Sequence, residues 1–340
     1  SGSAGLAIIL KKKNYLFTDG RYTIQSQIEC GKNFYIYGFE KLINCNLFKN
    51  LTLGIDPKLF TNTQIKKFFL KNNKIKYIKN NLVDEIKKKQ KNISIPFFSL
   101  NKKIVGESVN SKIKKISKYL KKKGSDYIFI SAPENVAWIL NIRGGDSPNS
   151  PVPNSRLIIS KSNKILLISK IENCKKLIKN KVLKSNQIID IDEFPKEILK
   201  LNGKSFVIDG KSCSIFFENL IKSKFKIKNK EDPTYLMKAI KNKSEINHMI
   251  NSHIHDGVAL TKFIYWIKNI NKKNISEVDA QIKLEQFRKK NKNYLYPSFN
   301  TIAGSGKNAA IVHYRAKKNN NKIIKSGDIF LCDSGGQYKY

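Results

Sequence analysis

Two residues near the end of the chain, Asp333 and His313, have the types and settings that catalysis requires. Asp333 follows the apolar run 329–332, which predicts a buried strand. A carboxylate there is costly unless it is paired, hydrogen-bonded or bound to a metal. His313 lies in the apolar segment 309–314, after a glycine-flanked loop. From the residues alone each also admits a structural role: Asp333 as the cap of the following turn, and His313 as a satisfied core residue.

The other chemistry-bearing residues form no competing catalytic motif. The sequence has no H-E-x-x-H pair, G-x-S-x-G elbow or C-x-x-C pair. No helical pattern follows Gly304-Ser305-Gly306, so this loop is not a dinucleotide fingerprint. We expect His248 on a polar helix face, His253 packed on the apolar stripe of the same helix, and His255 beside Asp256. Any metal would therefore be held mainly by carboxylates.

Charge and cysteine content narrow the class of protein. The 340 residues carry 65 Lys and Arg against 26 Asp and Glu, a net charge of +39 that would suit nucleic acid. Sixty of these cations are lysines spread along the chain, whereas base reading favours arginine, so we expect no specific nucleic-acid partner. No apolar run approaches the ~18 residues of a membrane span. Five scattered cysteines without a zinc spacing indicate reduced thiols and a cytoplasmic location.

Arginine is rare in this lysine-rich chain, so each arginine marks a position where its planar, bidentate geometry could matter. Three of the five arginines, Arg21, Arg143 and Arg315, lie in segments that carry the family resemblance described below.

The hydrophobic pattern predicts two α/β domains in the first two thirds of the chain. In residues 1–104, the segments 6–10 and 15–18 predict a hairpin, 51–55 predicts a strand, and 61–71 has helical spacing. In residues 105–230 the expected elements are, in order, an amphipathic helix 108–123, a strand 127–131, a helix 134–141, a hairpin of 157–159 with 165–168, and a strand 205–208.

A third domain, residues 231–340, is expected after the turn-forming segment 230–233. Ser244 is expected to cap a long helix that reaches about Trp266, and Ser276 with Asp279 matches a capping box for the next helix. Strand-like segments follow at 297–303, 309–314 and 328–333. Helices followed by strands predict an α+β domain.

A series of segments in chain order carries a family resemblance. They are Ser1–Gly5, Phe17-Thr18-Asp19-Gly20-Arg21-Tyr22, and the segments 106–108, 134–144, 238–242, 253–260, 301–315 and 333–338. Together they resemble the Xaa-Pro aminopeptidases of the creatinase and pita-bread metallopeptidase family over the whole length of the chain. The resemblance implies two creatinase-like α/β domains followed by the first half of a pita-bread catalytic domain.

The resemblance also implies a reaction and a site. The reaction is removal of the residue ahead of an N-terminal proline, with X-Pro peptides as substrates and two divalent metal ions, usually Mn²⁺, held by two Asp, one His and two Glu. Asp333 matches the first of these aspartates. His313 matches the histidine that contacts the scissile amide and is not a ligand. A homodimer is implied too, with Arg21 and Tyr22 in supporting roles at a partner's site.

The other four metal ligands have no counterpart in these residues, so we expect a sequence truncated at both ends. Such a fragment would be inactive alone, with apolar strand surface exposed in a half-formed third domain. Two alternatives remain open: another hydrolase of the fold, such as a prolidase or a creatinase-like enzyme, and a non-catalytic peptide- or protein-binding homologue.

Overall fold

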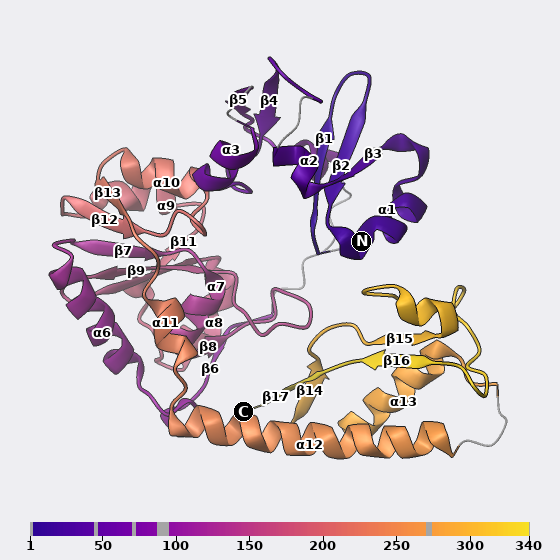
Figure 1. Ribbon diagram of the computed structural model, residues 1–340. Helices are drawn as coiled ribbons and strands as arrows, with labels where there is room; N and C mark the ends of the chain where they lie inside the picture. The colour runs from indigo at the N-terminus through magenta and orange to yellow at the C-terminus, as the bar shows by residue number, and fades with distance from the viewer. Residues whose placement is uncertain (1–2, 44–46, 70–72, 87–94, 270–273, 340) are drawn as a thin grey trace. The chain divides into compact units, whose positions relative to one another are not determined.

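The computed structural model describes residues 3–43, 47–69, 73–86, 95–269 and 274–339, which form a mixed α/β structure (Figure 1). Residues 48–248 form one compact unit, and residues 1–47 together with 249–340 form the other. These limits differ from the expected domain limits at 104 and 230, and the three-domain division remains a proposal. Among the helices of the described residues, none combines the length and apolar content needed to cross a bilayer.

The unit formed by residues 48–248 is built on a six-stranded sheet with the order β11-β10-β9-β7-β12-β13. Its strands, in chain order, are β7 (Tyr127–Ile130), β9 (Arg156–Ser160), β10 (Ile165–Ser169), β11 (Ile188–Asp190), β12 (Ser205–Ile208) and β13 (Lys226–Asn229). Strand β9 is antiparallel to both of its neighbours, and the remaining pairs are parallel. The predicted hairpin and the strands at 127 and 205 are confirmed.

Two apolar cores lie on opposite faces of this sheet. Strand side chains alternate between the faces, so Ile128 and Ile130 belong to one core and Phe129 to the other. The first core is covered by α6 (Val109–Lys122), α7 (Pro133–Leu140) and α8 (Ile171–Lys179), and the second by α9 (Phe194–Glu197) and α10 (Ile215–Lys222). The predicted amphipathic helix at 108–123 is confirmed, with the apolar side chains of Ile113, Ile116 and Leu120 buried.

Shorter elements complete this unit. They are β4 (Thr52–Ile55), α3 (Asn62–Phe68), β5 (Lys74–Tyr77), α4 (Leu82–Ile86), β6 (Phe98–Ser99), α5 (Lys102–Val105), β8 (Ile142–Arg143) and α11 (Thr234–Ala239). The predicted strand at 51–55 and the helix beginning at 61 are confirmed, with Thr61 and Gln64 forming a capping box. The expected end of that helix, at Lys71, lies outside the described residues.

The other unit begins with a three-stranded sheet and two helices. The strands are β1 (Gly5–Ile9), β2 (Asn14–Thr18) and β3 (Tyr35–Gly38), and the helices are α1 (Thr23–Cys30) and α2 (Phe39–Ile43). β1 and β2 pair antiparallel, which confirms the predicted hairpin, and β3 runs parallel to β2. Residues Ser1 and Gly2 of the matched segment and Cys45 lie outside the described residues.

The long helix α12 (Lys243–Lys268) begins one residue before its expected cap, Ser244. The cap is Asn242, whose Oδ1 accepts from the Glu245 backbone N at 3.1 Å while Glu245 Oε2 accepts from the Asn242 N at 2.9 Å. The expectation of a packed His253 is wrong, because that side chain is exposed together with the apolar side chains Ile246, Ile250, Ile254 and Val258.

Helix α13 (Glu277–Lys289) packs with α12 and β16 around the buried side chains of Phe263, Ala280 and Leu284. The predicted capping box of Ser276 and Asp279 is confirmed. Strand β14 (Tyr294–Pro297) pairs with β17 (Gly336–Tyr338), and β15 (Ile302–Ser305) pairs with β16 (Phe330–Asp333), both antiparallel.

Two expectations in this region are wrong. The segment 309–314 is not a strand, because the chain leaves β15 through the 3-10 helix η5 (Gly306–Ala310). The run 329–332 is not buried on both faces. Phe330 and Cys332 pack on the helical core, whereas Ile329 and Leu331 are 79% and 41% exposed. The apolar surface expected at these strands is therefore present, and Asp333 lies on the same open face as Leu331.

Candidate metal and catalytic site

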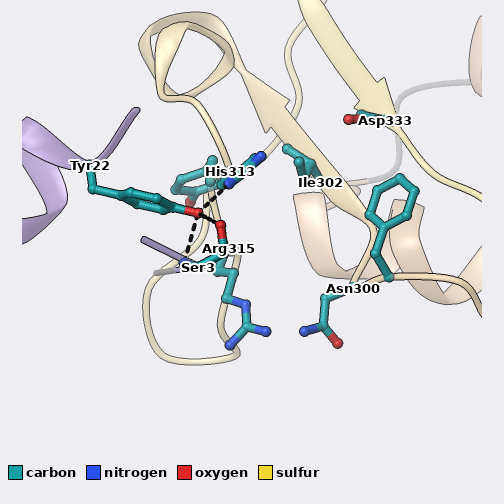
Figure 2. A pocket seen from close by; sticks show the side chains of 9 residues that line it. Ser3, Tyr22, Asn300, Ile302, His313, Arg315 and Asp333 are labelled. Atoms are coloured by element: carbon teal, nitrogen blue, oxygen red, sulfur yellow. Dashed lines mark hydrogen bonds between the residues drawn. The ribbon is translucent and has the colours of Figure 1, made fainter. Parts of the chain in front are cut away.

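A pocket of about 440 Å³ brings the two predicted site residues together (Figure 2). His313 and Asp333 both line it, as do Ser3, Tyr22 and Arg315. The side chains of His313 and Asp333 are exposed. Neither is therefore a core residue, and the alternative of a satisfied buried histidine does not apply.

Asp333 is placed by the pairing of two strands. It lies at the end of β16, directly opposite Ile302 of β15. Beyond it, the Ser298 backbone N donates to the Gly335 carbonyl oxygen at 2.9 Å. A Cβ at Gly335 would lie 2.4 Å from Ser298 Oγ, so any side chain at this position would require the Ser298 hydroxyl to move. Within the part of the chain that the structure describes, the Asp333 carboxylate makes no hydrogen bond, so it is free to bind a cation and does not cap the turn.

His313 has a left-handed backbone with φ +57°, which is uncommon for a residue other than glycine. The Tyr22 hydroxyl lies 2.7 Å from its Nδ1 atom. In Figure 2 the second ring nitrogen points away from Tyr22, into the pocket. The ring is thus held on one side and open on the other.

The loop that carries His313 is fixed by a buried carboxylate, Glu277, at the first turn of α13. Glu277 is fully buried. Its oxygens accept from Ser305 N at 2.8 Å, Asn308 Nδ2 at 3.0 Å, Tyr314 Oη at 2.8 Å and Lys322 N at 3.0 Å. Burial, and then the hydrogen bond to Glu277, raise the pKa of Tyr314 above its usual range. This carboxylate therefore joins the end of β15, η5 and the residue after His313.

The strand that carries Asp333 is fixed by a second buried charge, Arg288 of α13, which is 2% exposed. Its Nε and Nη2 atoms donate to the two carboxylate oxygens of Asp256 at 2.8 and 2.9 Å, and Nη2 also donates to Ser334 Oγ at 3.1 Å. The Tyr338 hydroxyl donates to Asp256 at 2.8 Å. Burial alone would raise the pKa of Asp256, but hydrogen bonds from Arg288 and Tyr338 outweigh it and hold that pKa below its ordinary value.

Sequence reasoning missed Glu277 and Arg288 as parts of this site. It expected Tyr22 in a supporting role at a partner's site, whereas Tyr22 contacts His313 of its own chain. It placed Asp256 beside His255, whereas Asp256 pairs with Arg288. The available signals were weak: Glu277 lies inside the recognised capping box, and Arg288 is one of only five arginines. Neither signal reveals that the side chain is buried.

One side chain of the pocket, Asp333, is a suitable ligand for a hard divalent cation. Asp333 offers carboxylate oxygens, the ligands that Mn²⁺ prefers. In the described ranges, no group of three or more His, Cys, Asp and Glu side chains could hold a metal. The described residues thus fit one ligand of a metal centre and do not form a complete one.

Comparison with known proteins assigns two consecutive regions of the chain to protein families. Residues 87–245 match the creatinase/prolidase N-terminal domain, and residues 247–340 match the metallopeptidase family M24. The chain is 34% identical to a probable Xaa-Pro aminopeptidase P from Paracoccidioides brasiliensis and 31% identical to the Xaa-Pro aminopeptidase ApepP of Drosophila melanogaster. In each case the match covers 99% of this chain, which spans about 60% of the length of these relatives.

Solved structures give the same result. An X-prolyl aminopeptidase from Caenorhabditis elegans, described as a cytosolic enzyme with a di-nuclear active site, superposes with a TM-score of 0.88 at 25% identity. That match covers 100% of this chain and 59% of the other. The prolidase from Pyrococcus horikoshii OT3 superposes with a TM-score of 0.52 at 26% identity, over 68% of this chain and 62% of the other. Residues 247–340 thus belong to the metallopeptidase family M24, with its pita-bread fold, and residues 87–245 belong to the creatinase/prolidase N-terminal domain family.

Proposed function

We propose that the protein is a metal-dependent aminopeptidase that releases the N-terminal residue from peptides with proline in second position. The observation that carries the proposal is that His313 and Asp333 line one pocket in a chain of this family. The names of the relatives support it, since they match 99% of the chain at 31–34% identity as Xaa-Pro aminopeptidases. Because the chain spans about 60% of those relatives, the activity is proposed for the longer protein that contains it.

In this proposal Asp333 is a ligand of a pair of Mn²⁺ ions, and sequence outside these 340 residues supplies the other ligands. When bound, such a metal pair would polarise the scissile carbonyl and activate a water molecule for attack. The X-Pro amide is tertiary and carries no N–H. Recognition of the X-Pro bond therefore cannot use an amide N–H and relies on its carbonyl and on the shape of the proline ring.

His313 is the proposed catalytic residue. Its second ring nitrogen faces the pocket (Figure 2), from which an N–H could donate to the scissile amide group as negative charge develops on it. A donor already fixed in place stabilises that charge without reorganisation. The exposed ring and the 2.7 Å contact on its other side support this role.

We further propose a cytoplasmic homodimer with three domains, 1–104, 105–230 and 231–340, the last continuing beyond these residues. Supporting observations are the scattered cysteines, four of which are free thiols in the described residues, and the family assignment of the two regions.

The test is peptide cleavage by the longest open reading frame that contains these residues. The purified protein with Mn²⁺ is expected to cleave X-Pro tripeptides and longer peptides at the first bond and to spare matched X-Ala peptides. Hydrolysis restricted to X-Pro dipeptides would indicate a prolidase, and hydrolysis of creatine a creatinase-like enzyme. Binding of X-Pro peptides without cleavage would favour the non-catalytic homologue.

A further inference from the structure

A tyrosine far away in the sequence touches the proposed catalytic histidine. The Tyr22 hydroxyl lies 2.7 Å from His313 Nδ1, and the two ring centroids are 5.5 Å apart at an interplanar angle of 58°. Tyr22 is 4% exposed, whereas His313 is exposed. The fixed partner in this pair is therefore the tyrosine.

The position of Tyr22 is set by its own neighbours. It ends the 3-10 helix η1 (Gly20–Tyr22), which Asp19 caps by accepting from the Arg21 backbone N. The hydroxyl also accepts from Ser3 N at 2.9 Å and lies 2.6 Å from Ser3 Oγ. Contacts to both ends of the side chain thus limit its movement.

These contacts bear on where the hydroxyl proton goes. A tyrosine hydroxyl has one proton to donate and two lone pairs to accept with. Ser3 N–H can only donate, and the Ser3 hydroxyl can donate as well, so together they fill both lone pairs. The proton of the more acidic phenol is then donated to the basic ring nitrogen Nδ1. A histidine whose Nδ1 accepts carries its proton on Nε2.

We propose that Tyr22 is a positioning residue for His313, which keeps Nδ1 as an acceptor so that a protonated Nε2 faces the pocket. The inference rests on the function proposed for His313. It makes the N-terminal segment part of the reacting centre of the same chain, because a donor on the pocket side requires this tautomer. His313 makes this contact with a left-handed backbone conformation.

The experiment combines ring ¹⁵N NMR with kinetics on the full-length protein. His313→Asn assigns the signal of His313. In the wild type at a pH where the ring is neutral, Nε2 is expected to carry the proton and Nδ1 to be unprotonated. Tyr22→Phe should shift His313 toward the mixture of tautomers of a free imidazole and lower kcat about tenfold, with KM changed less than about twofold.

Two further variants separate this role from packing. Tyr35→Phe removes a half-exposed hydroxyl from the same N-terminal segment and should change neither tautomer nor kcat. Ser3→Ala frees one lone pair of the Tyr22 hydroxyl, which could then accept from an Nδ1–H. The tautomer should therefore shift toward a mixture and kcat should fall, both by less than in Tyr22→Phe.

The outcomes distinguish this inference from the proposed function. A protonated Nδ1 in the wild type, or no change of tautomer in Tyr22→Phe, overturns the inference even if X-Pro peptides are cleaved. If the tautomer responds to Tyr22→Phe while no peptide is cleaved, the pairing stands and the proposed function fails.

Discussion

The buried pair of Arg288 and Asp256 should dominate the stability of the strands that carry Asp333. Arg288 is 2% exposed and donates two hydrogen bonds to Asp256 and one to Ser334. Arg288→Met would leave a partly buried carboxylate with Tyr338 as its remaining partner. Loss of one member of a buried pair costs about 3–5 kcal/mol. Because the Asp256 side chain is 22% exposed, we expect about 3 kcal/mol, the lower end of that range.

Native-state hydrogen exchange is the assay, because it reports the opening free energy of each element separately. Amides of β16 and β17 should exchange about a hundredfold faster in Arg288→Met. The matched control is Lys289→Met, the next residue on the same helix, whose ion pair with Glu285 is at the surface. That variant should cost less than ~0.5 kcal/mol.

The double variant Asp256→Leu with Arg288→Met should cost less than Arg288→Met alone, because it removes the unpaired charge. Lowering the pH should also weaken the contribution of the Arg288 and Asp256 pair to stability. The pKa of Asp256 lies below its ordinary value of 3.8, so the pair contributes fully above that pH and its contribution falls as the pH drops through the folded-state pKa. Equal costs for Arg288→Met and Lys289→Met, or additive costs in the double variant, would refute this reasoning.

Two further predictions concern buried charges. Lys112 is 1% exposed and donates to Trp138 O and Asn141 Oδ1, and burial lowers its pKa from 10.5 to about 8. At a pH between about 8 and 10.5, Lys112 is protonated in the unfolded chain and largely deprotonated in the folded chain. The stability of wild type relative to Lys112→Met should therefore rise by up to about 3 kcal/mol as the pH increases, and a constant difference in denaturant unfolding would contradict this. Glu277→Gln replaces one carboxylate oxygen by an amide N–H₂ that faces at least two of the four donors. Exchange in β15 and η5 should therefore reveal a loss of about 2 kcal/mol, whereas the surface change Glu285→Gln on the same helix should cost little.

The elements that sequence predicted well are those whose signals are local. The hairpin of β1 and β2, the amphipathic helix α6 and the capping box at Ser276 each depend on residues within a few positions of one another. Asp333 and His313 were predicted as site residues from similarly short runs. The structure places both in the lining of one pocket, and their roles remain proposals.

The parts that sequence did not predict depend on contacts between distant segments. Nothing near Arg288 indicates that Asp256, 32 residues away, is its partner, and Tyr22 is separated from His313 by 291 positions. The predicted strand at 309–314 failed because the chain turns tightly after β15. A Cβ at Gly304 would lie 2.8 Å from the Asn308 carbonyl oxygen, so the turn folds back on the strand and η5 replaces an extended segment.

The exposure of His253 has a different cause. The spacing of apolar residues in α12 correctly predicts an apolar stripe on the helix. Periodicity alone cannot show which part of this stripe is covered by other elements of the protein. In α12 the covered part includes Ala259 and Phe263, whereas Ile246, Ile250 and Ile254 remain exposed.

The central claim is most directly tested by metal-dependent release of the first residue from an X-Pro peptide, measured by mass spectrometry on the full-length protein. Wild type stripped with a chelator should be inactive and should regain activity with Mn²⁺. Asp333→Asn should remain inactive at Mn²⁺ concentrations that restore the wild type, while Asp328→Asn, a change at a nearby carboxylate outside the pocket lining, should regain activity. Cleavage that survives the chelator, or full activity in Asp333→Asn, would contradict the account.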